Sequence, residues 1–83
     1  MAPPELDDRV RGIVAAHLDV EPQRLAPGAR LGEDLCVDSL TAVELLMVLE
    51  DEFDIALPED RVGPIETYAD LVSAVAAQVA RTA

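Results

Sequence analysis

Apolar residues recur at intervals of three and four along three separate stretches of the chain, and this spacing is typical of amphipathic helices. The stretches cover residues 5–18, 39–53 and about 68–80. With Phe53 and Tyr68 as the only aromatic residues among 83, the core must be aliphatic and thin. Helices packed on helices suit such a core better than a sheet does. We therefore predict an all-α fold, a small bundle of three main helices.

The apolar stripes of these helices contain the residues that we expect to face the core. His17 continues the first stripe near the end of its helix, so we interpret it as a packed or half-exposed structural histidine, with a functional role as the alternative. We expect a single domain over residues 1–83, in which residues 1–4 form a frayed tail. The inward residues are Leu6, Val10, Ile13, Val14 and Leu18, then Ala42, Leu45, Leu46, Leu49 and Phe53, and finally Tyr68, Leu71, Val72, Val75 and Val79.

The connection between the first two helices, residues 19–37, is longer than most helix–helix loops. Prolines and glycines interrupt it, which predicts turns, and a short helical turn is expected around residues 22–25. Four apolar residues are expected to hold this loop against the helices, namely Val20, Leu25, Leu31 and Leu35.

A second, shorter connection precedes the last helix. Pro58 can start a helix and Gly63-Pro64 stops it, so we expect a single helical turn at residues 59–62. Thr67 and Asp70 have the spacing of a capping box, with aspartate in place of the usual glutamate. This pattern predicts the start of the last helix.

The start of the second helix has the clearest chemical signal. Asp38 is a good N-cap, because its carboxylate can accept a hydrogen bond from a free N–H of the first turn. Ser39 would then be the first helical residue, with its hydroxyl at the positive end of the helix dipole. Unpaired N–H groups converge at such a helix end and suit a phosphate. Ser39 is therefore well placed to carry a phosphate ester.

The charge of the chain is strongly negative and unevenly distributed. Six arginines and no lysine stand against 17 acids, for a net charge of −11, and residues 31–60 contain acids without a single basic residue. Such a chain is unsuited to nucleic acid and to anionic membrane surfaces. A surface of one sign favours docking on basic partners.

The sequence also argues against several classes of site. One histidine and one cysteine cannot build a Cys/His zinc centre, no calcium-loop pattern is present, and Ser39 lies outside any Gly-x-Ser-x-Gly elbow. We expect no metal site and no intrinsic catalysis. The chain lacks an apolar run of roughly 20 residues and a signal-peptide pattern, and its single cysteine excludes an internal disulfide, so a cytoplasmic protein is expected.

The residues Asp38-Ser39-Leu40, followed by Val43-Glu44-Leu45 and then Leu49-Glu50-Asp51-Glu52-Phe53, resemble the acyl carrier proteins, over roughly Val10 to Val75. The resemblance implies a bundle of three main helices plus one short helix, which would fall at about residues 59–63, with a long first loop. It also implies a discrete, type II carrier for fatty-acid or polyketide biosynthesis.

The same resemblance implies a covalent cofactor. Ser39 would receive 4′-phosphopantetheine from coenzyme A, and Asp38 would assist by approaching the Mg²⁺ of the transferase. The thiol of the cofactor would then carry acyl groups as thioesters. The alternative from another class is a non-covalent acidic helical adaptor that binds a basic protein partner.

Partner contacts are expected along the second helix. By resemblance, Leu40, Glu44, Met47, Glu50 and Asp51 match positions that meet a phosphopantetheinyl transferase, a ketosynthase, an acyltransferase and other enzymes with basic patches. Leu40, Val43 and Met47 can form an exposed apolar strip ringed by acids, although Val43 and Met47 can equally widen the core stripe. A monomer without nucleic acid or a membrane span is expected.

Cys36 is a departure from the family, which usually has glycine at this position. If the backbone there has a positive φ, a cysteine carries a steric penalty, and otherwise the exchange is nearly neutral. We expect a small, semi-buried side chain, with a redox role or a disulfide-linked dimer as the alternative.

Overall fold

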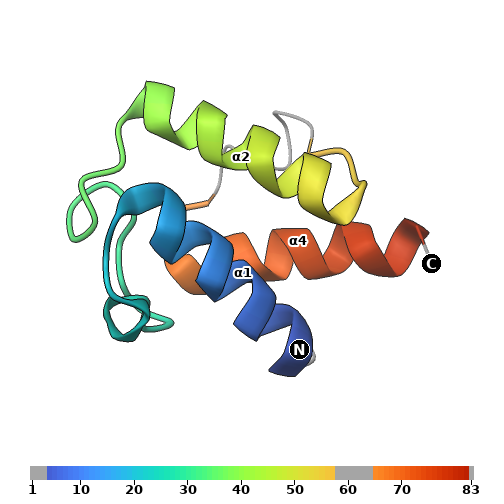
Figure 1. Ribbon diagram of the computed structural model, residues 1–83, viewed down its shortest axis with the longest axis horizontal. Coiled ribbons are helices and arrows are strands. Elements are labelled where there is room, and N and C mark those ends of the chain that lie inside the picture. Colours follow the sequence, from blue (N-terminus) through green and yellow to red (C-terminus); the bar gives the residue numbers. More distant parts are fainter. Residues whose placement is uncertain (1–3, 58–64, 83) are drawn as a thin grey trace.

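The computed structural model describes residues 4–57 and 65–82. These residues form three long helices, α1 (Pro4–Leu18), α2 (Ser39–Phe53) and α4 (Tyr68–Thr82), and one 3₁₀ turn, η1 (Pro22–Arg24) (Figure 1). The described part of the chain contains no β-strand beyond an isolated bridge, which confirms the predicted all-α fold. The short helix expected at 59–63 lies outside the described residues.

The helix bounds follow the sequence prediction closely. α2 begins at Ser39 and ends at Phe53, as predicted. α1 begins at Pro4, one residue earlier than expected, because proline has a fixed φ that suits the first turn of a helix. The expected tail is therefore wrong for residue 4, and residues 1–3 lie outside the described residues. α4 continues to Thr82, two residues beyond the predicted end.

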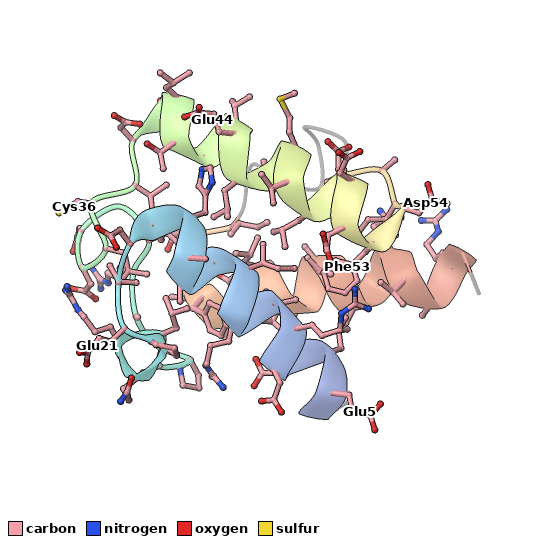
Figure 2. The ribbon with its side chains drawn as sticks, in the orientation of Figure 1. Glu5, Glu21, Cys36, Glu44, Phe53 and Asp54 are labelled. Atoms are coloured by element: carbon pink, nitrogen blue, oxygen red, sulfur yellow. The ribbon has the colours of Figure 1, made fainter. Side chains whose placement is uncertain are left out.

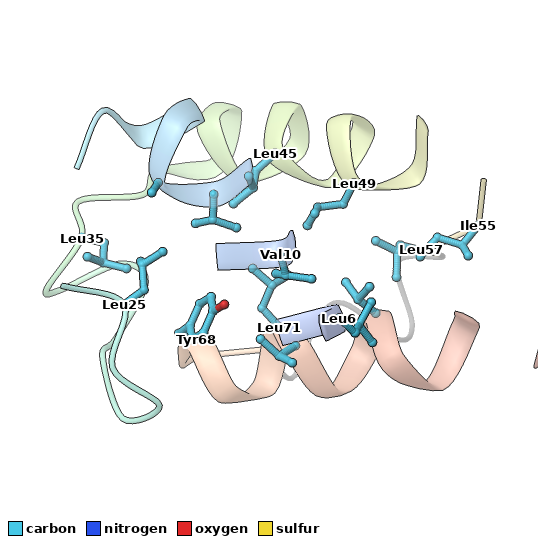
Figure 3. Close-up of a cluster of buried hydrophobic side chains, with 14 residues drawn as sticks. Leu6, Val10, Leu25, Leu35, Leu45, Leu49, Ile55, Leu57, Tyr68 and Leu71 are labelled. Atoms are coloured by element: carbon cyan, nitrogen blue, oxygen red, sulfur yellow. The ribbon is translucent and has the colours of Figure 1, made fainter. Parts of the chain in front are cut away.

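The core is aliphatic and lies where α1 meets both other helices (Figures 1 and 3). The inward stripes of α2 and α4 are confirmed, since Leu45, Leu49 and Leu71 are fully buried. His17 is the exception: its side chain is exposed. Val14 and Ala15 occupy the buried positions near the end of α1, which leaves His17 outside the packed stripe and corrects our interpretation of it.

The long first loop packs on the helices as predicted. Leu25 and Leu35 are buried, whereas Val20 and Leu31 are partly buried against the core. The expected helical turn is η1, whose proline stands at its first position.

The loop is also joined to the start of α4 by main-chain hydrogen bonds, which the sequence did not predict. The Leu31 N–H donates to the Glu66 carbonyl oxygen at 2.9 Å, and the Tyr68 N–H donates to the Ala29 carbonyl oxygen at 2.9 Å. An isolated antiparallel bridge pairs Arg30 with Thr67 between them. This pairing, the loop–α4 seam, brings two segments that are far apart in the sequence into direct contact.

Tyr68 anchors the same region from inside the core (Figure 3). Its hydroxyl donates to Asp7 Oδ1 at 3.1 Å, and Arg11 pairs with the Asp7 carboxylate at 3.2 Å. Arg11 also donates to the Leu25 carbonyl oxygen at 3.2 Å. Burial, together with the hydrogen bond to Asp7, raises the pKa of Tyr68 well above its ordinary value. These contacts connect α1, α4 and the long loop.

Candidate functional site

The N-terminus of α2 is capped by Asp38, as predicted. Asp38 has extended backbone angles, and its Oδ1 accepts a hydrogen bond from the Thr41 N–H at 2.8 Å. Its carbonyl oxygen accepts from the Ala42 N–H at 2.9 Å, which begins the helix. The bond from the Thr41 N–H is the main cause that lowers the pKa of Asp38. The residue before Ser39 is therefore a firmly ionised carboxylate.

Ser39 is the first residue of α2 and is exposed. The chain has one other serine, Ser73, which is also exposed but lies in the interior of α4. Of the two serines, only Ser39 therefore lies at a helix N-terminus, where the dipole and main-chain N–H groups favour a phosphate.

Cys36 lies three residues before Ser39 in a left-handed backbone conformation, with φ of 58°. Its side chain is exposed, so the expectation of a semi-buried thiol is wrong. The cysteine side chain therefore lies at the surface. The positive φ is the condition under which we expected a steric penalty, so the Cβ atom of Cys36 carries one.

A groove of about 560 Å³ begins at the start of α2. Its lining is mostly apolar, so we call it the apolar groove. It is lined by the apolar residues Leu31, Val37, Ala42, Leu45, Leu46, Ile65 and Leu71, by Asp38, Ser39 and Gly32, and by the charged residues Arg30, Glu33 and Glu66. Its size is in the range of small-molecule sites, about 300–1,000 Å³. The sequence could not reveal this groove, because the loop–α4 seam is what brings Leu31 beside Ile65.

The outer face of α2 is apolar at its centre and acidic around it. Leu40, Val43 and Met47 are 69%, 54% and 62% exposed, which resolves the open alternative in favour of a surface strip. Glu44 and Asp51 are exposed beside the strip, and Glu44 lies near its Ser39 end (Figure 2). Val48, which the sequence analysis did not single out, extends the strip at 37% exposure.

A second hollow follows this face to the end of α2. It is lined by His17 of α1, by Glu44, Met47, Val48, Glu50 and Asp51 of α2, and by Asp54 and Ile55 of the segment that follows. We call this hollow the acidic groove. His17 is thus placed beside acids of α2, a juxtaposition that no local sequence pattern could indicate.

Glu50 differs from the other predicted contact residues. Leu40, Glu44, Met47 and Asp51 are exposed, whereas Glu50 is half-buried. Its Oε2 accepts a hydrogen bond from the Leu57 N–H at 2.9 Å. One of its oxygens is therefore already in use inside the molecule.

The chain matches the family described as "Phosphopantetheine attachment site" over residues 8–75. It is 42% identical over 73 residues to an acyl carrier protein of Caulobacter vibrioides, which covers 88% of this chain and 94% of the relative. The chain belongs to the acyl carrier protein family.

Two further acyl carrier proteins support the membership. The relative from Thermosynechococcus vestitus is 38% identical over 76 residues, covering 92% of this chain and 94% of its own. The relative from Phenylobacterium zucineum is 46% identical over 65 residues, covering 78% and 82%. The predicted family, carrier function and 4′-phosphopantetheine cofactor are thereby confirmed.

The site described above suits the cofactor of the acyl carrier family. An exposed hydroxyl on a helix N-terminus is free to be esterified, and the apolar groove beside it has room for a small ligand. Within residues 4–57 and 65–82, no three His, Cys, Asp or Glu side chains are grouped to hold a metal ion. None of the described helices is long and apolar enough to cross a bilayer.

Proposed function

We propose that Ser39 is the residue of this acyl carrier to which 4′-phosphopantetheine is attached. The observation that carries the proposal is the exposed Ser39 hydroxyl on the first residue of α2. In the attachment, Ser39 Oγ bonds to the β-phosphorus of coenzyme A and adenosine 3′,5′-bisphosphate leaves. Once attached, the cofactor supplies a thiol that carries acyl groups as thioesters in fatty-acid or polyketide assembly.

Asp38 would assist the attachment by interacting with the Mg²⁺ that a transferase holds. Its carboxylate adjoins Ser39, and the hydrogen bond from the Thr41 N–H lowers its pKa further. A carboxylate next to a phosphoryl centre would repel it, and a bridging divalent cation removes that repulsion.

The outer face of α2 would be the docking face for partner enzymes. Leu40 and Met47 supply exposed apolar contacts, and Glu44 and Asp51 supply charge for basic patches on a phosphopantetheinyl transferase, a ketosynthase or an acyltransferase. Glu50 lies at the edge of this face. A monomer in the cytoplasm, formed as a single domain over residues 1–83, stays our prediction.

The chain itself would catalyse no step. A nucleophilic serine needs an adjacent base, and His17 is the only histidine in the sequence. His17 lines the acidic groove, whereas Ser39 lines the apolar groove at the start of α2. This separation favours a carrier whose reactive chemistry is supplied by its partners.

The test is the intact mass after incubation with coenzyme A, Mg²⁺ and a phosphopantetheinyl transferase of broad specificity. We expect the wild-type chain and Ser73→Ala to gain one phosphopantetheinyl group, and Ser39→Ala to gain none. Ser73 is the matched control, because it is the other exposed serine. If no transferase modifies the wild-type chain, the function that remains is that of a non-covalent acidic adaptor. If Ser39→Ala is still modified, Ser39 is not the attachment residue.

A further inference from the structure

Glu50 accepts the hydrogen bonds that hold the segment after α2. Its carbonyl oxygen accepts from the Asp54 N–H and from the Ile55 N–H, the latter at 3.1 Å. Its side-chain Oε2 accepts from the Leu57 N–H at 2.9 Å. Asp54 has a left-handed backbone, with φ of 54°, so the chain reverses sharply here. One residue of α2 thus fixes three N–H groups of residues 54–57.

Residues 54–57, which Glu50 holds in place, contribute both to the core and to the lining of the acidic groove. Ile55 and Leu57 are buried at the end of the hydrophobic cluster (Figure 3). Asp54 and Ile55 also line the acidic groove together with the exposed residues Met47 and Asp51. The position of residues 54–57 therefore determines the shape of that groove at the end of α2.

We propose that Glu50 is a positioning residue of the docking face, which acts as a hydrogen-bond acceptor for Leu57 and not as an ion-pair partner of the docked enzyme. The half-buried carboxylate keeps residues 54–57 in place, and these residues in turn shape the acidic groove. The direct charge contacts come from exposed acids such as Asp51. This assignment rests on the proposed docking function.

Two isosteric variants separate a positioning role from a charge role. Glu50→Gln removes the negative charge but keeps a side-chain oxygen that can accept from the Leu57 N–H. Asp51→Asn removes the charge of the exposed neighbour, whose side chain the structure places on the surface. Glu50→Ala removes both the charge and the acceptor. The proposal predicts that Glu50→Gln resembles wild type and that Glu50→Ala does not.

The first measurement is amide hydrogen exchange at Leu57, which requires no partner. We expect exchange to quicken about tenfold in Glu50→Ala, because a hydrogen bond to a charged group is lost, and to stay within about threefold of wild type in Glu50→Gln. Unchanged exchange in Glu50→Ala would overturn the positioning role.

The second measurement is the KM and kcat of the four chains with a broad-specificity phosphopantetheinyl transferase. We expect KM to rise about fivefold in Glu50→Ala and in Asp51→Asn, and less than twofold in Glu50→Gln. The kcat should stay within about twofold in all, because Glu50 follows Ser39 by three helical turns, roughly 16 Å.

An equal rise in KM for Glu50→Gln and Asp51→Asn would make Glu50 a direct charge contact and overturn the proposal. A Glu50→Ala chain that does not fold would agree with a positioning role, and the two isosteric variants would then decide between acceptor and charge. A wild-type chain that gains no cofactor would refute the proposed function alone, since the exchange of Leu57 is read without the transferase.

Discussion

At the scale of single residues, Cys36 has a conformation that suits a smaller residue. Its φ of 58° lies in the left-handed region, where a Cβ atom crowds the following carbonyl oxygen. The acyl carrier family, as the sequence resemblance implies, usually has glycine there. The thiol is exposed, so burial of the side chain does not compensate for the crowding.

Cys36→Gly should therefore stabilise the fold. Relief of the left-handed conformation contributes about 1–2 kcal/mol, and the greater freedom of glycine in the unfolded chain removes about 0.5–1 kcal/mol of this gain. We expect a net gain of about 0.5–1 kcal/mol and a Tm higher by roughly 2–8 °C in thermal unfolding. Cys36→Ala is the matched control, because it removes the thiol and keeps Cβ. An equal gain in Cys36→Ala would assign the effect to the thiol.

At the scale of elements, both α2 and α4 begin at carboxylate caps. Asp38 accepts from the Thr41 N–H, and Asp70 Oδ2 accepts from the N–H groups of Glu66 and Thr67, each at 3.1 Å. The Asp70 N–H donates back to Thr67 Oγ1, which completes the predicted capping box. These hydrogen bonds lower the pKa of Asp38 through Thr41 and that of Asp70 through Glu66 and Thr67.

The caps should make the fold sensitive to acid. A carboxyl whose pKa is lower in the folded than in the unfolded chain contributes stability above its unfolded pKa of about 3.9. That contribution is lost as the pH falls through the folded pKa. We expect Tm to fall between pH 5 and about pH 2, and to fall less in an Asp38→Asn/Asp70→Asn chain, since asparagine can cap a helix but does not titrate. Identical pH profiles of Tm would contradict this.

Whether a feature could be predicted depends on how far apart in the sequence the residues that form it lie. The helices, the Asp38 cap and the Thr67–Asp70 box were predicted, because periodicity and capping are local signals. The exposed His17, the apolar groove and the bond from Leu57 to Glu50 were not, because each depends on how distant segments pack. The position of Ser39 at a helix start was predictable because that signal is local, and its role as the attachment residue stays a prediction.

At the scale of the whole molecule, Tyr68 helps to connect α1, α4 and the long loop, a contact that helical periodicity does not predict. Its ring is buried, and its hydroxyl reaches Asp7, which is 61 positions away in the sequence. Arg11 joins the same carboxylate and also holds the long loop through Leu25. A thin aliphatic core thereby gains a polar connection among three segments.

Tyr68→Phe should test this connection. The variant keeps the buried ring and removes the hydrogen bond to Asp7, so we expect a loss of about 1 kcal/mol and a Tm lower by roughly 4–8 °C. In a double-mutant cycle with Asp7→Ala, the two losses should add only in part, because both changes remove the bond to Asp7 Oδ1. The Asp7 carbonyl oxygen, which accepts from the hydroxyl at 3.3 Å, is kept in Asp7→Ala. Full additivity would show that the hydroxyl and Asp7 contribute independently.

The loop–α4 seam has a consequence for how the protein is made on the ribosome. The Ala29 carbonyl oxygen and the Leu31 N–H have their main-chain partners at residues 68 and 66. The apolar groove beside Ser39 is likewise lined by Ile65, Glu66 and Leu71. A nascent chain whose residues 65–71 are still in the exit tunnel therefore has the serine but not its finished surroundings. Those surroundings are completed only after residues 65–71 have emerged.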